Sequence, residues 1–401
     1  MIDFPYLKDI TRKTSSKILM LVVDGLGGLP LPETGRSELE TANLPNLDAL
    51  ARRSAAGLTT PVGTGITPGS GPGHTALFGY DPVKYLVGRG VLEALGLGVE
   101  LAEGDVAIRC NFCTVDDAGT IVDRRAGRIS DIQAGALVEQ LRQIEVPGVN
   151  LSLYQGKGHR FVLVLKGDGL GTDVAETDPG TTGLSPVPAT ALSEGSQRTA
   201  EAVAAFLAAA HDLLSGQANA NMVLARGYSK VPDWPSMGDA YRLSPAAIAA
   251  YPMYRGLASV LGMEVLSTGD NFDDELDTLE GAFSRHDFFF VHYKPADAAG
   301  EDGDFRAKVL ALEELDARIP RLLALGADAV VVAGDHSTPA IAASHTWHSV
   351  PLLVHSALTE GDGVPELTER ACAMGSIGRI SATGVMMLAM ANAGKLQRFG
   401  P

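Results

Sequence analysis

KILMLVVDGL (residues 17–26) is the stretch of sequence that decides the fold. It holds an unbroken apolar run from Ile18 to Val23, followed at once by Asp24. A continuous run of this length is typical of a β-strand buried on both faces, and it is far too short to cross a membrane. The pattern predicts a central strand of a parallel sheet that ends in a carboxylate.

Three later stretches have the same form and predict further buried parallel strands: DFFFVHYK (287–294), DAVVVAGDH (328–336) and VPLLVHS (350–356). Helical patterns alternate with them at 43–55, 305–326 and 384–396. Strands that alternate with helices indicate an α/β fold, a core sheet with helices on both faces.

The middle of the chain has a different character. Residues 105–128 read as two strands around a turn, 160–169 as a third strand, and 193–214 as an alanine-rich helix. We therefore expect an α+β domain inserted at 101–265 within a discontinuous core of residues 1–100 and 266–401.

Composition excludes several classes of function. The chain has 401 residues, a formal net charge of −16 and no run of Lys or Arg, which argues against nucleic acid or an anionic membrane as a partner. Its N-terminus lacks the apolar core of a signal peptide, and its three cysteines suit a reducing cytoplasm, the expected location. The oligomeric state stays open.

Residues with metal-binding side chains follow the predicted strands. Asp24, Asp297, Asp335 and His336 stand at or after strand ends, and His345 lies in a loop before the next strand. Any one of them could be a helix cap or a solvated loop residue. Because ligand sites form at the carboxyl ends of strands, the whole set predicts a site for two divalent cations.

TPGSGPGHTALFGYDP (67–82) sets Ser70 among glycines and prolines. Such a stretch is either a surface turn with an incidental serine or a tight loop that exposes a nucleophile. A bound cation would lower the pKa of the serine hydroxyl, so the predicted metal site favours the nucleophile. For His74 two interpretations remain, orientation of a phosphoryl group or capping of the next helix.

Motifs along nearly the whole chain resemble the archaeal-type cofactor-independent phosphoglycerate mutases of the alkaline phosphatase superfamily. They are VVDGLGG, LETANLPNLDALA, PGSGPGHTALFGYDP, GRGVLEALG, DVAIRCNF, DRRAGR, ANMVLARG, YRGLASVLGM, KPADAAGEDGD and GDHSTPAIAASH. The resemblance implies an alkaline-phosphatase-like core that interconverts 3-phosphoglycerate and 2-phosphoglycerate through phosphoserine, without 2,3-bisphosphoglycerate.

By this resemblance Asp24, Ser70, Asp335 and His336 hold one metal ion, and Asp297 and His345 hold the other. The family usually has histidine where this chain has Glu301. We expect Glu301 to remain a ligand, with His348 or water as the alternative. An added carboxylate favours hard ions, so Mn²⁺ is expected, with Mg²⁺, Zn²⁺ or Co²⁺ as alternatives. Archaeal members also commonly read SDxAH where this chain reads SGPGH.

An anionic substrate needs local positive charge in so acidic a chain. Arginines 109, 124, 125, 128, 160 and 226 fall in the expected insertion, whose closure over the site would exclude water. The resemblance implies Arg128, His159 and Arg226 as substrate contacts and Lys294 as a phosphate contact. A proton carrier for the glycerate hydroxyls is also needed, and Asp123 is our candidate.

Two other functions stay open. One is a related phosphotransferase or phosphatase on another small phosphate, such as a homoserine-kinase-like activity; the other is a protein that binds a metabolite or metal without turnover. GLGG (25–28) lacks the spacing of a dinucleotide fingerprint, so no nicotinamide or flavin is expected. The CxxC of Cys110 and Cys113 is interpreted as core packing.

Overall fold

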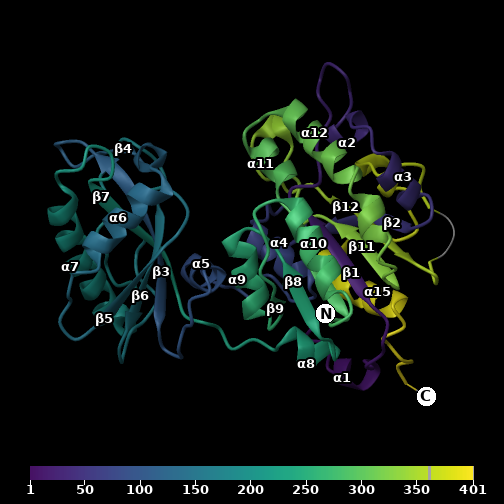
Figure 1. Cartoon of the computed structure of the whole chain (residues 1–401), viewed down its shortest axis with the longest axis horizontal. Helices are drawn as coiled ribbons and strands as arrows, with labels where there is room; N and C mark the ends of the chain where they lie inside the picture. The colour runs from purple at the N-terminus through teal and green to yellow at the C-terminus, as the bar shows by residue number, and fades with distance from the viewer. Residues whose placement is uncertain (360–362, 401) are drawn as a thin grey trace. The chain divides into compact units, whose positions relative to one another are not determined.

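The structure is a computed structural model that describes residues 1–359 and 363–400. The chain divides into two compact units, Met1–Leu86 with Trp234–Pro401, and Val87–Asp233 (Figure 1). The expected insertion, 101–265, differs from this division at both ends. Residues 87–100 belong to the second unit because α5 (Arg89–Gly96) packs on its sheet, and residues 234–265 join the first unit because they supply two strands of its sheet.

The first unit is built on an eight-stranded sheet. Its strands, in spatial order, are β13 (Gly378–Ser381), β2 (Ala55–Thr60), β12 (Val350–Ser356), β11 (Ala329–Ala333), β1 (Ile18–Val23), β10 (Phe288–Tyr293), β8 (Pro245–Ile248) and β9 (Glu264–Val265). The stretch at 17–26 thus forms the central strand, with parallel neighbours on both sides.

One predicted direction is wrong. VPLLVHS forms β12 as expected, but β12 runs antiparallel to both β11 and β2. An apolar run shows that a strand is buried and carries no information about its direction, which depends on the path of the connecting loop. The predicted α/β class is confirmed.

Helices cover both faces of this sheet. Leu19, Leu21 and Val23 of β1 point into a core completed by leucines of α3 (Pro45–Ala51), α10 (Phe272–Ala282) and α12 (Phe305–Asp316). On the other face, Phe78 beyond α4 (Ser70–Leu77) packs edge-on against Phe288 and Phe290, and α15 (Val385–Asn392) packs on β11 and β12. A β-strand presents alternate residues to opposite faces, so β1 serves both layers.

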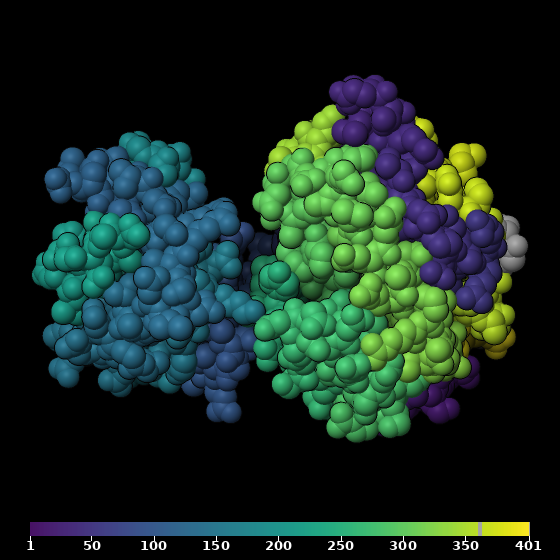
Figure 2. Space-filling view, turned by 45° about the horizontal axis from the view of Figure 1, so that its top comes forward, coloured from purple at the N-terminus to yellow at the C-terminus, as the bar shows by residue number. Residues whose placement is uncertain are grey.

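The first unit is completed by short helices: α1 (Leu7–Ile10), α2 (Glu38–Thr41), α8 (Met237–Tyr241), α9 (Pro252–Val260), α11 (Pro295–Glu301), α13 (Ile319–Leu323), α14 (Glu369–Cys372), η3 (Ala340–Ala342) and η4 (Ala382–Gly384). Segments distant in sequence meet on its surface. Figure 2 shows N-terminal segments (purple) beside C-terminal ones (yellow), and Arg370 donates a hydrogen bond to the Gly35 carbonyl at 3.0 Å.

The second unit is an antiparallel sheet with helices. Its strands are β4 (Ile121–Asp123), β3 (Val106–Val115), β6 (Arg160–Lys166), β5 (Asn150–Gln155) and β7 (Met222–Ser229), with β7 paired to β3. Besides α5, its helical elements are η1 (Ala126–Arg128), α6 (Asp131–Leu141), η2 (Glu194–Ser196) and α7 (Gln197–Leu214). Cys110 and Cys113 are buried free thiols in separate apolar clusters, as core packing predicts. Among the described residues, no helix is long and apolar enough to cross a membrane.

Candidate functional site

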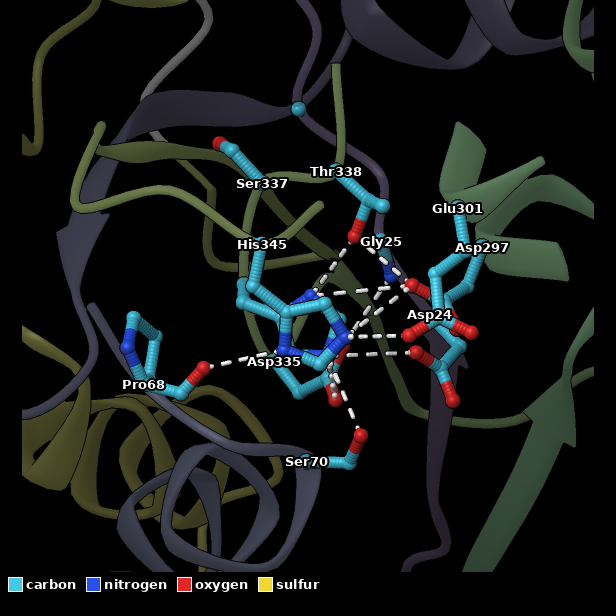
Figure 3. A network of polar contacts seen from close by, with 12 residues as sticks. Asp24, Gly25, Pro68, Ser70, Asp297, Glu301, Asp335, Ser337, Thr338 and His345 are labelled. Atoms are coloured by element: carbon cyan, nitrogen blue, oxygen red, sulfur yellow. Dashed lines mark hydrogen bonds and ion pairs between the residues drawn. The ribbon is translucent and has the colours of Figure 1, made fainter. Parts of the chain in front are cut away.

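The predicted strand-end residues of the first unit come together. Asp24 follows β1, and Asp335 and His336 follow β11, the strand beside it. Nε2 of His336 lies 3.4 Å from Oδ1 of Asp24 and 3.0 Å from Oδ2 of Asp335. All three residues are fully buried. They form one group able to hold a metal ion, the first cluster (Figure 3).

A second cluster shares His336 with the first. Oδ1 of Asp297, in α11 after β10, lies 3.9 Å from Nδ1 of His336 and 3.5 Å from Nε2 of His345. The rings of His336 and His345 stack at 3.6 Å between centroids. Thr338 donates to Oδ1 of Asp297 at 2.7 Å, which fixes this carboxylate. Asp297, His336 and His345 are a second group of possible metal ligands.

Ser70 lies beside the first cluster. Its Oγ is 3.2 Å from Nε2 of His336, a contact drawn in Figure 3. We expected Ser70 on a tight loop, but it is the first residue of α4, after Gly69 in extended conformation. Pro72 suits this first turn because an α-helix needs no backbone N–H there. The first turn still leaves the hydroxyl half-buried beside His336 rather than covered.

Two glycines allow these segments to approach each other. A side chain at Gly73 of α4 would clash with the backbone of Asp335, so glycine lets the helix lie directly against the loop after β11. Gly25 has a φ of +67°, a left-handed conformation that glycine adopts without strain, and a side chain there would clash with Asp297 and Thr338. The glycines around Ser70 and Asp24 are therefore part of the construction of the site.

The residues of the clusters fit a divalent cation. Oδ1 of Asp24 and Oδ2 of Asp335 are buried, and neither accepts a hydrogen bond of good geometry from the residues that the structure describes. Leaving a buried carboxylate oxygen without a partner costs free energy, which a bound cation would offset. Carboxylate oxygen with imidazole nitrogen is a donor set that Mn²⁺ and Zn²⁺ both accept.

The electrostatics keep the carboxylates ionised. Burial and Asp335 raise the pKa of Asp24, but His292 and Lys294 outweigh them, and the pKa falls to about 2. Burial likewise opposes ionisation of Asp335, yet His336 and His74 hold its pKa well below the usual value. Both carboxylates are therefore charged at neutral pH.

His74 does not cap α4, whose N-cap is Gly69. It is fully buried within α4, with Nδ1 2.8 Å from the Ser70 carbonyl oxygen and 3.1 Å from Oδ2 of Asp335. Burial lowers its pKa, but Asp335 outweighs burial and the pKa is raised. His74 thus contacts Asp335 and stabilises its charged form.

Glu301 lies at the edge of the second cluster. Its side chain is 54% exposed, and its Oε1 is 3.4 Å from Nε2 of His345. It lies outside the two groups that the described residues form as possible metal sites. The alternative ligand, His348, has Nδ1 3.0 Å from the Thr346 hydroxyl and stacks on Trp347.

Sequence reasoning missed three buried residues around the site. Tyr254 of α9 and His292 of β10 both hydrogen bond to Asp24, and Lys294, which was predicted, bonds to Asp24 and Asp297. Lys308 of α12 is fully buried and donates to the carbonyls of Gly25, Gly27 and Thr338 at 2.8 to 2.9 Å. No local pattern in the sequence distinguishes Tyr254, His292 and Lys308 from residues that fill the core.

The second unit holds a cluster of arginines. Arg109 of β3 and Arg226 of β7 are cross-strand partners, and Arg89 and Arg160 lie close enough to lower the pKa of Arg109. Burial lowers that pKa most, to about 10. Glu93 lies 3.6 Å from Arg109, and Glu176 lies 3.8 Å from Arg226. Like charges directly opposite each other on a sheet repel, so this cluster is suited to receiving an anion.

The other predicted contacts of the second unit lie near this sheet. Burial, Arg160 and Arg109 lower the pKa of His159 to about 4. Asp123, at the end of β4, accepts from the backbone N–H groups of Arg125 at 2.7 Å and Gly127 at 2.6 Å, which lower its pKa. Arg128 is exposed at the end of η1, and Arg124 is engaged by Asp178 in a two-pronged ion pair.

The fold and the site define an α/β enzyme with a serine set beside two clusters of metal-ligand residue types. A family model for 2,3-bisphosphoglycerate-independent phosphoglycerate mutase matches residues 51–219. Probable mutases of this kind from Thermus thermophilus and Deinococcus radiodurans are 49% and 47% identical, with 99% and 98% of each chain covered. The chain therefore belongs to the family of 2,3-bisphosphoglycerate-independent phosphoglycerate mutases, which are isomerases.

Solved structures agree with this assignment. The PH0037 protein from Pyrococcus horikoshii matches with a TM-score of 0.83 at 26% identity, over 97% of this chain and all of that one (100%). A cofactor-independent phosphoglycerate mutase from Thermoplasma acidophilum matches with a TM-score of 0.69 at 31% identity, over 94% of this chain and 100% of that one. The predicted family is confirmed.

Proposed function

We propose that this enzyme interconverts 3-phosphoglycerate and 2-phosphoglycerate through a phosphoserine at Ser70, with two divalent cations bound beside it. One observation carries the proposal: Ser70 Oγ lies 3.2 Å from His336 Nε2, within the cluster of buried carboxylates at the ends of β1 and β11. A serine in that environment is suited to nucleophilic attack on phosphorus.

Each of the two clusters would hold one of the two ions. Asp24, Ser70, Asp335 and His336 would hold one, and Asp297 and His345 the other, with Glu301 at its edge. Bound there, the ions would lower the pKa of the serine hydroxyl and neutralise charge on the phosphoryl oxygens. Mn²⁺ is the proposed ion, because carboxylates outnumber imidazoles around the two positions.

The chain's own residues account for the transfer. Ser70 Oγ loses its proton and bonds to phosphorus as the phosphorus–oxygen bond to the glycerate breaks, and the released glycerate oxygen takes up a proton to become a hydroxyl. The other glycerate hydroxyl then gives up its proton as its oxygen bonds to phosphorus, the Oγ–P bond breaks, and Ser70 regains its proton. Lys294, whose Nζ lies 3.2 Å from Asp24 Oδ2, is proposed to contact the phosphoryl oxygens. Asp123, whose pKa is lowered by the backbone N–H groups of Arg125 and Gly127, is a carboxylate at neutral pH and is proposed to carry a proton between the two glycerate oxygens.

The second unit is proposed as the substrate-binding domain. Arg128, His159 and Arg226 are its proposed contacts, and the cross-strand pair of Arg109 with Arg226 supports this assignment. Arginine side chains bind carboxylate and phosphate groups with two parallel hydrogen bonds, and a phosphoglycerate carries one group of each kind. This local cluster would overcome the acidic character of the whole chain.

The experiment is a coupled assay. Purified enzyme with Mn²⁺ is given 3-phosphoglycerate and enolase, before and after chelation, and intact-mass spectrometry follows a covalent phosphate. We expect activity that chelator abolishes, and a phosphoserine absent from Ser70→Ala. Ser54→Ala, which removes a buried hydroxyl bonded to the Leu50 carbonyl, is the matched control.

Three outcomes would overturn the proposal. Full activity in Ser70→Ala would exclude the serine relay. Free phosphate without 2-phosphoglycerate would indicate a phosphatase, and turnover of only another phosphate ester would indicate a different phosphotransferase.

A further inference from the structure

Tyr254 occupies a central position that neither the motifs nor the proposed reaction assigns. It lies in α9 and its side chain is buried, with 2% of its surface exposed. Its hydroxyl donates to Oδ2 of Asp24 and accepts from Nζ of Lys294 at 3.1 Å. One hydroxyl therefore joins a proposed metal ligand and the proposed phosphate contact.

The two oxygens of Asp24 have different surroundings. Oδ2 receives donors from Tyr254, from His292 Nε2 at 3.1 Å and from Lys294 at 3.2 Å. Oδ1 is buried, accepts no hydrogen bond from any described residue, and faces His336 in the first cluster. Because three donors hold Oδ2, the carboxylate cannot turn, and the same oxygen always faces the metal position.

The ring of Tyr254 is fixed by its neighbours. It stacks on the His292 ring with 3.7 Å between centroids and an angle of 27°, and it meets the His74 ring at 4.8 Å. His292 and His74 in turn contact Asp24 and Asp335, the two carboxylates of the first cluster. A phenol packed in this way has one orientation, so its hydroxyl is a donor fixed in advance of binding.

We propose that Tyr254 is a positioning residue that makes Asp24 a one-oxygen metal ligand and holds Lys294 away from Oδ1. The proposal rests on the proposed metal site at the first cluster. Without the phenol, Asp24 loses one of its three donors and Lys294 loses an acceptor, so the ammonium is free to pair more closely with the carboxylate. The cation would then compete with a lysine for Asp24.

The test measures Mn²⁺ binding directly, by the electron paramagnetic resonance signal of free Mn²⁺, and activity separately. We expect Tyr254→Phe to weaken Mn²⁺ binding by about 10-fold to 100-fold, the range for loss of a group that orients a metal ligand. At saturating Mn²⁺ we expect kcat to fall by about tenfold, with KM for phosphoglycerate changed by less than about threefold.

Tyr241→Phe is the matched control. Tyr241 is fully buried, and its hydroxyl donates to the Phe78 carbonyl at 3.2 Å, so both variants lose one buried phenol hydroxyl. We expect Tyr241→Phe to bind Mn²⁺ like the unaltered protein. A Tyr254→Phe variant with unchanged Mn²⁺ affinity would overturn the proposal, as would an equal loss in both variants, which would indicate a general effect of destabilisation.

A second pair of variants covers the case in which Tyr254→Phe fails to fold. His292→Gln keeps an N–H near the position of Nε2, whereas His292→Ala removes it. We expect glutamine to retain most of the Mn²⁺ affinity and alanine to lose it, and equal affinities would overturn the role of donors on Oδ2. If the unaltered protein itself binds no Mn²⁺, the proposed metal site has failed, and that outcome is distinct from failure of the role of Tyr254.

Discussion

The two units of this enzyme concentrate opposite charges in different ways. The first unit brings carboxylates and imidazoles to the ends of β1, β10 and β11, from segments separated by hundreds of residues in the chain. The second unit sets Arg109 and Arg226 opposite each other within an antiparallel sheet. One cluster depends on loops after parallel strands, and the other on the register of two neighbouring strands.

The compensation of charge differs as well. In the first unit the partly buried Lys294 contacts Asp24 and Asp297, yet Oδ1 of Asp24 accepts no hydrogen bond from any residue that the structure describes. In the second unit Glu93 lies 3.6 Å from Arg109, while Arg226 is paired with Glu176 at 3.8 Å and with the buried Asp178 at 3.3 Å. The first cluster is thus suited to a small cation, and the arginine cluster of the second unit is suited to an anion. An acidic chain can therefore present local positive charge to an anionic substrate.

The largest effect is expected from Asp335→Asn, which breaks the first cluster. Oδ2 of Asp335 lies between His74 and His336, and Oδ1 accepts the Gly25 N–H at 3.1 Å. An amide cannot replace a charged ligand, so kcat should fall by about 10³-fold or more and Mn²⁺ binding should be lost. Steady-state assays and Mn²⁺ titration measure both quantities.

Asp316→Asn is the control for this change. Asp316 is also a buried carboxylate, but it accepts backbone N–H groups at the start of α3, including that of Leu47 at 2.7 Å. Asp316→Asn should lower the melting temperature and leave the affinity for Mn²⁺ unchanged. Retention of Mn²⁺ binding by Asp335→Asn would contradict the assignment of the first cluster.

A smaller loss is expected from Arg109→Met, which tests the arginine cluster of the second unit. Removing one of several arginines should lower kcat/KM by about 10²-fold, or about 2.7 kcal/mol, while Mn²⁺ affinity stays the same. Arg142→Met, at an exposed pair with Glu139, serves as the control. If Arg109→Met weakens Mn²⁺ binding and leaves kcat/KM unchanged, the arginine cluster does not serve the substrate and the division of roles between the two units is wrong.

The site residues at the strand ends could be predicted from the sequence, because parallel strands place their carboxyl ends at one edge of a sheet. Asp24, Asp335 and His336 follow apolar runs visible in the sequence, and Ser70 stands out among glycines. Tyr254 and His292 were not predictable, because each sits in an apolar segment where an aromatic side chain usually fills the core. Their importance depends on which residues the tertiary fold sets against Asp24.

The same distinction explains the errors in the fold. The antiparallel direction of β12 depends on the path of the preceding loop, and the short strand β8 (PAAI) lacks the bulky apolar run of its neighbours. The expected insertion therefore took in residues 234–265, which belong to the sheet of the first unit. The register that sets Arg109 opposite Arg226 likewise follows from pairing between strands more than a hundred residues apart.

Glu275 offers a contrast within the first unit and a smaller effect, on stability. Burial raises its pKa to about 8, whereas the clustered Asp24 stays ionised. The folded state therefore binds more protons than the unfolded chain between about pH 4.5 and 8, so the free energy of unfolding should fall as pH rises through that range. Glu275→Gln should remove this slope and be more stable at pH 8.5 by the order of 2 kcal/mol.

Urea unfolding of both proteins at pH 5.5 and pH 8.5 measures this difference. Glu264→Gln, at a carboxylate that is 61% exposed, is the control and should leave the slope in place. An advantage of Glu275→Gln that is the same at both pH values would mean that the buried carboxyl is ionised throughout.

The smallest effect is expected at Glu301, at the exposed edge of the second cluster. Its carboxylate pairs with His345 from 3.4 Å while more than half of its side chain meets solvent, so it contributes charge more than geometry. Glu301→His should change kcat by less than about fivefold, because Asp297 and His345 remain. It should shift preference from Mn²⁺ toward Zn²⁺ by about tenfold or less, since imidazole is the softer ligand. Competitive binding of Mn²⁺ and Zn²⁺ measures the shift, and Asp302→His is the neighbouring control. An unchanged preference would show that Glu301 is not a metal ligand, and Asp297 and His345 would then define the second metal position.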